Sequence, residues 1–387
     1  MTDAPLPDGS MSGQPLPSFA VGLSQHPDPA VAAAEVVGQV GDRLDGVPTV
    51  AMLFASGAMA NALGAVVDVI DTLMHPDVLV GTTAVGVVGS ALEVEQGDGL
   101  ALWAATGLPC TPVRLESLPA NPPIVAGLPA DIAEGSVVVA LADPYSFAVD
   151  GLVEELNQRP GDIQLAGGLA SAGPEQNRVI LGSEVHLTGA VGLIFPPGTA
   201  STVVSQGCRP IGSPWVVTEA ADQLAHALGG RPALERVNEL IEGLSPEDRA
   251  AAARGLHAGL VANEQQQEFK PGDFLIRGVL GADRNSGAVA IGDRLEVGQV
   301  LQFQVRDEAS ASNELDRLLD PVSGRAGLLF TCNGRGSHMF SEPSHDAAKV
   351  SDTVGSAVAG MFCAGELGPI AGRNAVHGFT ATVVVFP

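Results

Sequence analysis

The chain has 387 residues, enough for two domains of ordinary size. Hydrophobic residues make up 45% of it and charged residues only 16%, which favours well-filled cores over disorder. With 19 Lys and Arg against 44 Asp and Glu, the formal net charge is -25. This charge argues against binding to nucleic acid or to an anionic membrane, because both need clustered positive side chains.

The cysteines and the first residues indicate a cytoplasmic protein. The 4 cysteines are widely spaced and form no CxxC pair, so neither a disulfide framework nor a zinc site is indicated. Residues 1–20 are rich in Pro, Gly and Ser and lack the basic and apolar parts of a signal peptide, so we expect a disordered tail. Every long apolar stretch is interrupted by glycine or charge, which argues against a membrane span.

The predicted elements begin with a helix over 28–44, which has Pro29 in its first turn. A buried strand, an apolar helix, a strand running into a glycine-rich turn, and a further strand follow at 47–56, 58–74, 76–90 and 99–107. This β–α–β–turn–β order recurs at 136–144, 147–158, 162–173 and 188–198, and again at 326–334, 345–358, 359–372 and 378–386.

The three copies also agree in spacing. Similar numbers of residues separate the end of the first strand from the glycine that opens the later turn: Ser56 to Gly81, Asp143 to Gly167, and Cys332 to Gly360. The sequence therefore predicts three equivalent β-α-β-β units. Their strand ends are expected to gather around one pocket, lined by Ser56, Asp143, Cys332 and the turns at 81–89, 167–173 and 363–368.

Two segments interrupt the repeat. Residues 108–135 are rich in proline and predict an ordered surface connection. Residues 218–263 predict a helical insert, with Pro232 and the Ser245-Pro246 pair as helix starts, and a meander of strands follows it over 273–308. We expect the domain break at 205–215, giving domains at 21–212 and 213–387.

Several motifs resemble the FIST family. They are "QGCRPIGSPWVVTEA", the segment from "VLGADRNSGAVAIGD" to "RDEASA", "LLFTCNGRG" and "CAGELGPIAG", with "VGTTAVGVVG" and "LAGGLASAG" resembling the family's N-terminal domain. The resemblance covers roughly residues 45 to 387. It implies a two-domain sensory module that binds small ligands, amino acids among them, in bacteria. Some eukaryotic members carry an F-box. No output region is left over in this sequence, so a free-standing FIST protein is expected, and no settled catalytic set is implied.

The third unit contains the richest candidate chemistry. Cys332 ends a predicted strand and is a small buried side chain, a ligand contact, or a nucleophile activated by Arg335, His338 or His345. Asn333 and the glycines after it suit a turn with positive φ. That turn does not explain Arg335, which would pair with a ligand carboxylate or with an internal one, Asp346 or Glu366.

Glu366, in the predicted turn after Cys363, also has either a ligand or an internal partner. Glu366 comes shortly after Cys363 and would accept from a ligand amine, or from backbone N–H groups or Arg373. His338, His345 and Asp346 match no common metal site, and no phosphate-binding glycine motif is present. We therefore predict no metal, no cofactor and no catalytic residues.

Together these patterns predict an α/β or α+β fold of repeated β-α-β-β units in two domains, with mixed sheets and helices packed on their faces. The predicted function is sensing of a small, amino-acid-like ligand in the cytoplasm. The predicted ligand-binding residues are Cys332, Asn333, Arg335, Glu366, Cys363, Ser56 and Asp143. Two alternatives stay open: an enzyme that uses Cys332 and Glu366, and a scaffold whose acidic surface binds a protein partner.

Overall fold

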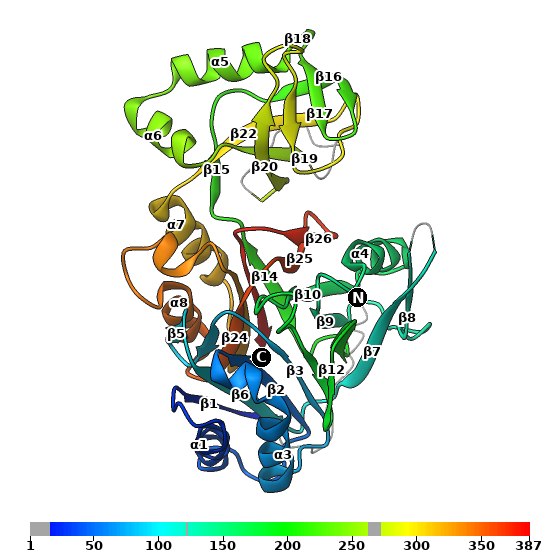
Figure 1. The fold of residues 1–387 in the computed structure, drawn as a ribbon, viewed down its shortest axis with the longest axis vertical. Helices are drawn as coiled ribbons and strands as arrows, with labels where there is room; N and C mark the ends of the chain where they lie inside the picture. The colour runs from blue at the N-terminus through cyan, green and yellow to red at the C-terminus, as the bar shows by residue number, and fades with distance from the viewer. Residues whose placement is uncertain (1–15, 121–122, 262–271) are drawn as a thin grey trace, which may run out of the picture.

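The computed structural model describes residues 16–120, 123–261 and 272–387, and three copies of one sheet pattern make up most of it (Figure 1). In each copy two strands run parallel and a third pairs antiparallel with the first. The strands are β2 (Val50–Ser56), β3 (Leu79–Thr83) and β6 (Gly99–Thr106); β9 (Val137–Ala142), β10 (Gln164–Leu169) and β13 (Ala190–Phe195); and β23 (Ala326–Cys332), β24 (Val358–Cys363) and β27 (Ala381–Phe386). The predicted mixed α/β fold of repeated β-α-β-β units is confirmed.

Each sheet is extended on one side by a strand that precedes its unit in the chain. These strands are β1 (Ser18–Ser24) beside β6, β7 (Thr111–Leu118) beside β13, and β14 (Ser201–Ser205) beside β27. A short strand, β8 (Ile124–Ala126), pairs with the outer side of β7.

On the other side, each sheet receives a hairpin from a different unit. The hairpin of the first unit, β4 (Val87–Gly89) and β5 (Leu92–Val94), pairs with β24 of the third. The hairpin of the second, β11 (Val179–Leu181) and β12 (Glu184–His186), pairs with β3 of the first. The hairpin of the third, β25 (Glu366–Ile370) and β26 (Arg373–His377), pairs with β10 of the second. The three units are therefore interlocked in a cycle.

Helices cover the outer faces of the sheets, and the inner faces share one core. The helices are α1 (Pro29–Gly41), α2 (Ala58–Asn61) and α3 (Leu63–Met74) on the first sheet, α4 (Val149–Gln158) on the second, and α7 (Glu308–Leu319) and α8 (His345–Val354) on the third. The third strands of all three units meet in the common core, where the ring of Phe386 lies 5.0 Å from Trp103 and 5.1 Å from Phe195. None of the described helices has both the length and the apolarity needed to cross a bilayer.

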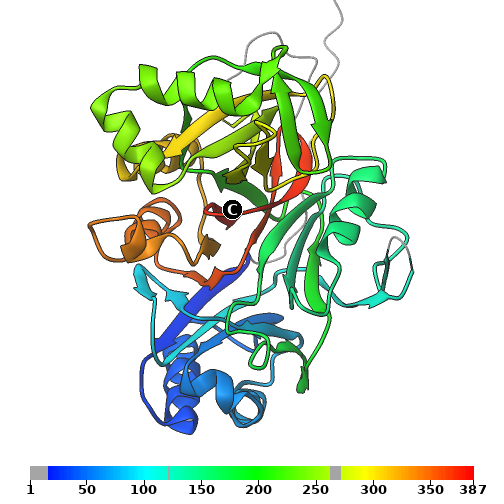
Figure 2. The ribbon, with the colours of Figure 1, turned by 45° about the horizontal axis from the view of Figure 1, so that its top comes forward.

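Between β14 and α7 the chain forms a small antiparallel barrel that lies beyond the three sheets in both views (Figures 1 and 2). The sheet closes because β19 pairs with both β20 and β22. Its elements are β15 (Cys208–Pro210), β16 (Trp215–Ala221), β17 (Leu224–Leu228), β18 (Arg231–Pro232), α5 (Ala233–Gly243), α6 (Pro246–Arg254), β19 (His257–Val261), β20 (Phe274–Ala282), β21 (Val289–Ile291) and β22 (Val300–Arg306).

The helical insert predicted over 218–263 is confirmed for α5 and α6 but wrong at residues 218–232 and 257–261, which form strands and their turns, and residues 262–263 lie outside the described residues. The segment after Thr218 forms the hairpin of β16 and β17, because Asp222 turns the chain in the left-handed conformation (φ 49°) and both strands find barrel partners. The predicted start of α6 is confirmed: the Ser245 side chain accepts a hydrogen bond from the Asp248 N–H (3.1 Å).

The structure also bears on the predicted tail, the proline-rich connection and the domain division. The tail predicted at 1–20 lies mostly outside the described residues, and its last residues belong to β1, which starts at Ser18. The connection predicted at 108–135 contains β7 and β8, so much of it extends the second sheet. The domain division at residue 212 stays a prediction, although β14 and β27 pair across it.

Candidate functional site

The second-strand ends of the three units meet at one point. The Ser171 hydroxyl donates to the Phe362 carbonyl (2.5 Å) and accepts from the Val85 N–H (2.9 Å), which joins residues after β3 and β10 to β24. A cavity of about 220 Å³ adjoins this junction, lined by Val85, Glu95, Gln96, Ser171, Asn333, His338 and Phe362. Of the seven predicted ligand-binding residues, only Asn333 lines it.

Ser56 and Asp143 are bound within their own units. The Ser56 hydroxyl donates to the Gly97 carbonyl (2.9 Å). The Asp143 carboxylate accepts from the Ser146 hydroxyl (2.5 Å) and from the Asn177 amide (2.9 Å). Both side chains are buried, and neither lines the cavity at the junction of the three units, so a ligand-binding role for them stays a prediction.

Arg335 has an internal partner, the alternative that the sequence left open. Its Nε and Nη2 donate to the two carboxylate oxygens of Asp346 at 2.7 and 2.8 Å, and the side chain is fully buried. Burial opposes ionisation of Asp346, but the charge and hydrogen bonds of Arg335 outweigh it and hold the pKa of that carboxyl well below its usual value. This bidentate pair fixes the turn after β23 to the start of α8.

The structure brings Cys332, Cys363 and Glu366 together beneath the surface. The two cysteines are register partners on β23 and β24. Burial raises the pKa of the Cys332 thiol to about 12 and that of the Glu366 carboxyl to about 8, and it also raises the pKa of Cys363. Both thiols are therefore protonated near neutral pH, which does not suit a nucleophile. A ligand-binding role for these residues stays a prediction.

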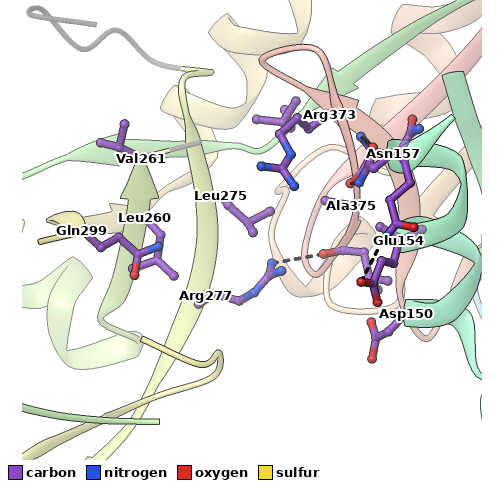
Figure 3. A pocket seen from close by; sticks show the side chains of 15 residues that line it. Asp150, Glu154, Asn157, Leu260, Val261, Leu275, Arg277, Gln299, Arg373 and Ala375 are labelled. Atoms are coloured by element: carbon purple, nitrogen blue, oxygen red, sulfur yellow. Dashed lines mark hydrogen bonds between the residues drawn. The ribbon is translucent and has the colours of Figure 1, made fainter. Parts of the chain in front are cut away.

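A cleft of about 510 Å³ opens between the barrel and the second sheet (Figure 3). Asp150 and Glu154 extend into it from α4, and Arg277 extends from β20 on the opposite wall (Figure 3). Arg373 lies at the start of β26 on the same cleft. The rest of the lining consists of the polar residues Asn157, Gln158, Gln299 and Asn374 and the apolar residues Val153, Leu260, Val261, Leu275, Ile370, Ala375 and Val376.

The walls of this cleft are fixed by polar contacts. Arg277 bonds to Asp293 through Nε (2.7 Å) and donates from Nη1 to the Val376 carbonyl (3.1 Å), which ties the barrel to β26. The side chain of Asn157 exchanges two hydrogen bonds with the backbone of Asn374, both 2.9 Å long, which ties α4 to the same strand.

Two charged groups in the cleft have no charged partner among the described residues. Within the described parts of the chain, Asp150 and Arg373 form no ion pair or side-chain hydrogen bond, and both are exposed. Among the described residues, Glu154 accepts only from the nearby Gln158 amide (3.0 Å). The cleft thus presents carboxylates on one element and a guanidinium on another, with an apolar floor between them.

Sequence reasoning missed this cleft because its walls come from three distant segments. The only signal was the charged face of α4, where Asp150 and Glu154 are four residues apart. In the sequence, Arg373 is indicated only as a partner of Glu366.

Comparison with known proteins identifies the chain. The FIST N domain model matches residues 49–231, and the FIST C domain model matches residues 233–369. The chain belongs to the FIST family. FIST domains are sensory domains of signal transduction.

Similar full-length relatives are known from mycobacteria. The FIST chain is 39% identical over 379 residues to the uncharacterized protein Mb0898c of Mycobacterium bovis, an alignment that covers 95% of this chain and 98% of that one. It is 38% identical over 379 residues to the uncharacterized protein Rv0628c of Mycobacterium tuberculosis, covering 95% and 99%.

Proposed function

We propose that this FIST protein senses a small zwitterionic ligand of the amino-acid class in the cleft between the barrel and the second sheet. One observation carries the proposal: unpaired groups of opposite charge, Asp150 and Arg373, line one cleft from different elements. The volume of about 510 Å³ lies within the range of small-molecule sites.

The chemistry of an amino acid fits these groups. Its carboxylate pairs with the guanidinium of Arg373, and its ammonium group pairs with Asp150 or Glu154. Its side chain covers the apolar floor, which includes Leu260 and Leu275. Because the ligand touches the barrel and the sheet together, it fixes their relative position, and this is the signal that a sensory domain passes on.

Isothermal titration calorimetry with a panel of amino acids tests the proposal. Arg373→Ala and Asp150→Asn are each expected to weaken binding about tenfold or more, since a hydrogen bond to a charged group contributes roughly 1.5–3 kcal/mol. N-acetylated and amidated forms of the best ligand should bind more weakly, because each lacks one charge.

Two exposed barrel residues outside the cleft lining, Arg284 and Glu219, provide matched controls. Arg284→Ala and Glu219→Gln should bind like the unmodified protein. If no amino acid binds, or if Arg373→Ala and Asp150→Asn bind normally, the cleft is not the sensory site.

A further inference from the structure

A second cavity lies between the barrel and the third unit. It has a volume of about 550 Å³, and β20 forms part of both cavities: Leu275 and Arg277 line the first, and Gly278 and Val279 line the second. The other walls come from α6, β19, β22, the turn after β23 and Phe379.

Arg306, at the end of β22, lines this cavity without a carboxylate partner. Among the described residues, its Nε and Nη2 are closed off from solvent and have no nitrogen or oxygen partner, while Nη1 lies 3.3 Å from Nε2 of His257 and the Cys208 thiol lies beside the guanidinium. The centre of the guanidinium lies 4.2 Å from the centre of the Phe379 ring. Burying a guanidinium without an anion raises the free energy of the folded state. A bound anion in the cavity would remove this penalty.

The neighbouring groups do not neutralise Arg306. Burial raises the pKa of the nearby Cys208 and Cys332 thiols, which keeps them uncharged. Burial and Arg306 itself lower the pKa of His257 to about 4, so that ring is neutral too. The adjacent carboxylates are engaged elsewhere: Asp307 binds Arg209 and caps α7, and Glu308 accepts from Ser341.

His257, which lines the same cavity, also lacks a partner. Among the described residues its Nδ1 is buried without a hydrogen bond. Because the guanidinium of Arg306 can only donate to Nε2, the proton of this neutral ring is on Nδ1. His257 and Arg306 therefore both have unsatisfied donors, whose natural partner is an anion.

The backbone beside the site is strained. Phe379 has a φ of 64°, which is rare for a bulky residue, and its ring lies where a side chain at position 334 would be, 2.6 Å from a Cβ built on Gly334. Gly334 is therefore needed to admit this ring over Arg306.

We propose that the second cavity is a binding site for a small organic acid, whose carboxylate pairs with Nε and Nη2 of Arg306. Arg335 shows the geometry of such a pair, because it uses the same two nitrogens to bind the carboxylate of Asp346. Leu256, Val279 and Met339 line the cavity and suit an apolar body on the acid. The ring of Phe379 covers the guanidinium, so the acid enters as that ring moves.

Calorimetry with hexanoate and phenylacetate tests this site, with hexanamide and phenylacetamide as uncharged controls and inorganic phosphate as a tetrahedral anion. The acids are expected to bind and the amides to bind at least tenfold more weakly. Arg306→Met should abolish binding of the acids, whereas Arg284→Met, in an exposed turn of the barrel, should leave it unchanged.

Thermal unfolding of the same variants separates a ligand site from a structural role. Arg306→Met should raise the melting temperature of the ligand-free protein, because it removes a buried charge that has no anionic partner. Four results would overturn the proposal: a lowered melting temperature, equal binding of acids and amides, tighter binding of phosphate than of either acid, or no binding of either acid at tens of millimolar. Since Arg306 lies outside the first cleft, these outcomes do not depend on amino-acid binding there.

Discussion

Asp346 and Glu366 are both buried carboxyl groups of the third unit, yet their environments favour opposite ionisation states. Burial penalises the charge of each. Asp346 has the guanidinium of Arg335 against both oxygens, which stabilises its ionised form. Glu366 has only neutral donors beside it: the N–H and hydroxyl of Thr380, both on Oε2, and the Cys332 thiol. Among the described residues its Oε1 has no hydrogen-bond partner. Near neutral pH, Asp346 is therefore charged and Glu366 is mostly protonated.

The protonated Glu366 makes the stability of the protein depend on pH. Its pKa is raised from 4.5 to about 8, so the folded state holds a proton that the unfolded state releases above 4.5. The favourable contribution is fully present below pH 4.5 and is lost as the pH rises through 8. Glu366→Gln should flatten this decline, measured as the free energy of unfolding in urea between pH 5 and 9. An unchanged slope would show that Glu366 is ionised in the fold.

Arg335 is expected to be essential for folding rather than for ligand binding. Arg335→Met leaves the Asp346 charge buried without its guanidinium partner, with only the Thr331 hydroxyl and the His345 ring beside it, and breaking a buried pair in this way costs about 3–5 kcal/mol. Urea denaturation should show this loss, while Arg284→Met, in an exposed turn, should change stability by about 0.5 kcal/mol or less. If Arg335→Met unfolds like the unmodified protein, the pair with Asp346 does not form in solution.

The glycine that recurs in the second strand of each unit is required for the same steric reason in all three. Gly81, Gly167 and Gly360 lie inside β3, β10 and β24, not in turns as the sequence suggested. At each, an added Cβ would meet the carbonyl oxygen of its register partner on the first strand, at 2.4, 2.0 and 1.7 Å. The parallel strands of every unit approach too closely there for any other residue.

Glycine substitutions should distinguish this close approach from ordinary chain flexibility. Gly360→Ala should prevent β23 and β24 from pairing and strongly destabilise the protein, because backbone must shift to make room. Gly38, inside α1, has nothing within 4 Å of an added Cβ, so Gly38→Ala should stabilise by about 0.5–1 kcal/mol. Melting temperatures of the two variants test this contrast, which fails if they shift in the same direction.

The elements that were predictable are those whose pattern is local. The Asp28-Pro29 start of α1 and the apolar runs of β2, β9 and β23 are visible in the sequence, because capping and burial on both faces leave plain signatures. The hairpin of β16 and β17 was mistaken for a helix because its strand form depends on barrel partners far along the chain.

The sequence showed three units, but not that each one's hairpin joins the sheet of another. A hairpin such as β25 and β26 carries no local mark of the sheet that it joins, and its pairing with β10 joins Gly167 to Leu367, far apart in the chain. The first cleft was hidden for the same reason, since α4, β20 and β26 approach only after the barrel and sheets assemble. The candidate residues from one motif proved to be mostly buried and internally bonded, which is what a strand end inside such an assembly requires.

The interlocked sheets also predict which fragments of the chain fold on their own. A fragment of residues 1–212 lacks β27, the partner of β14, as well as β24, which holds the hairpin of the first unit, and the β25 edge of the second sheet. It would expose much of the common core, so we expect no cooperative unfolding transition. The barrel fragment 207–307 keeps its strands paired with one another and should unfold cooperatively.

Circular dichroism during urea titration, together with the dispersion of amide signals in NMR spectra, tests both fragments. A cooperative transition and a dispersed spectrum for 1–212 would support a domain break near residue 212 and argue against interdependent sheets. A cooperative barrel beside an unfolded 1–212 fragment would instead show that the chain folds as one interlocked core with the barrel inserted between β14 and α7. Ligands held between those two bodies would then act by changing how the barrel sits on the core.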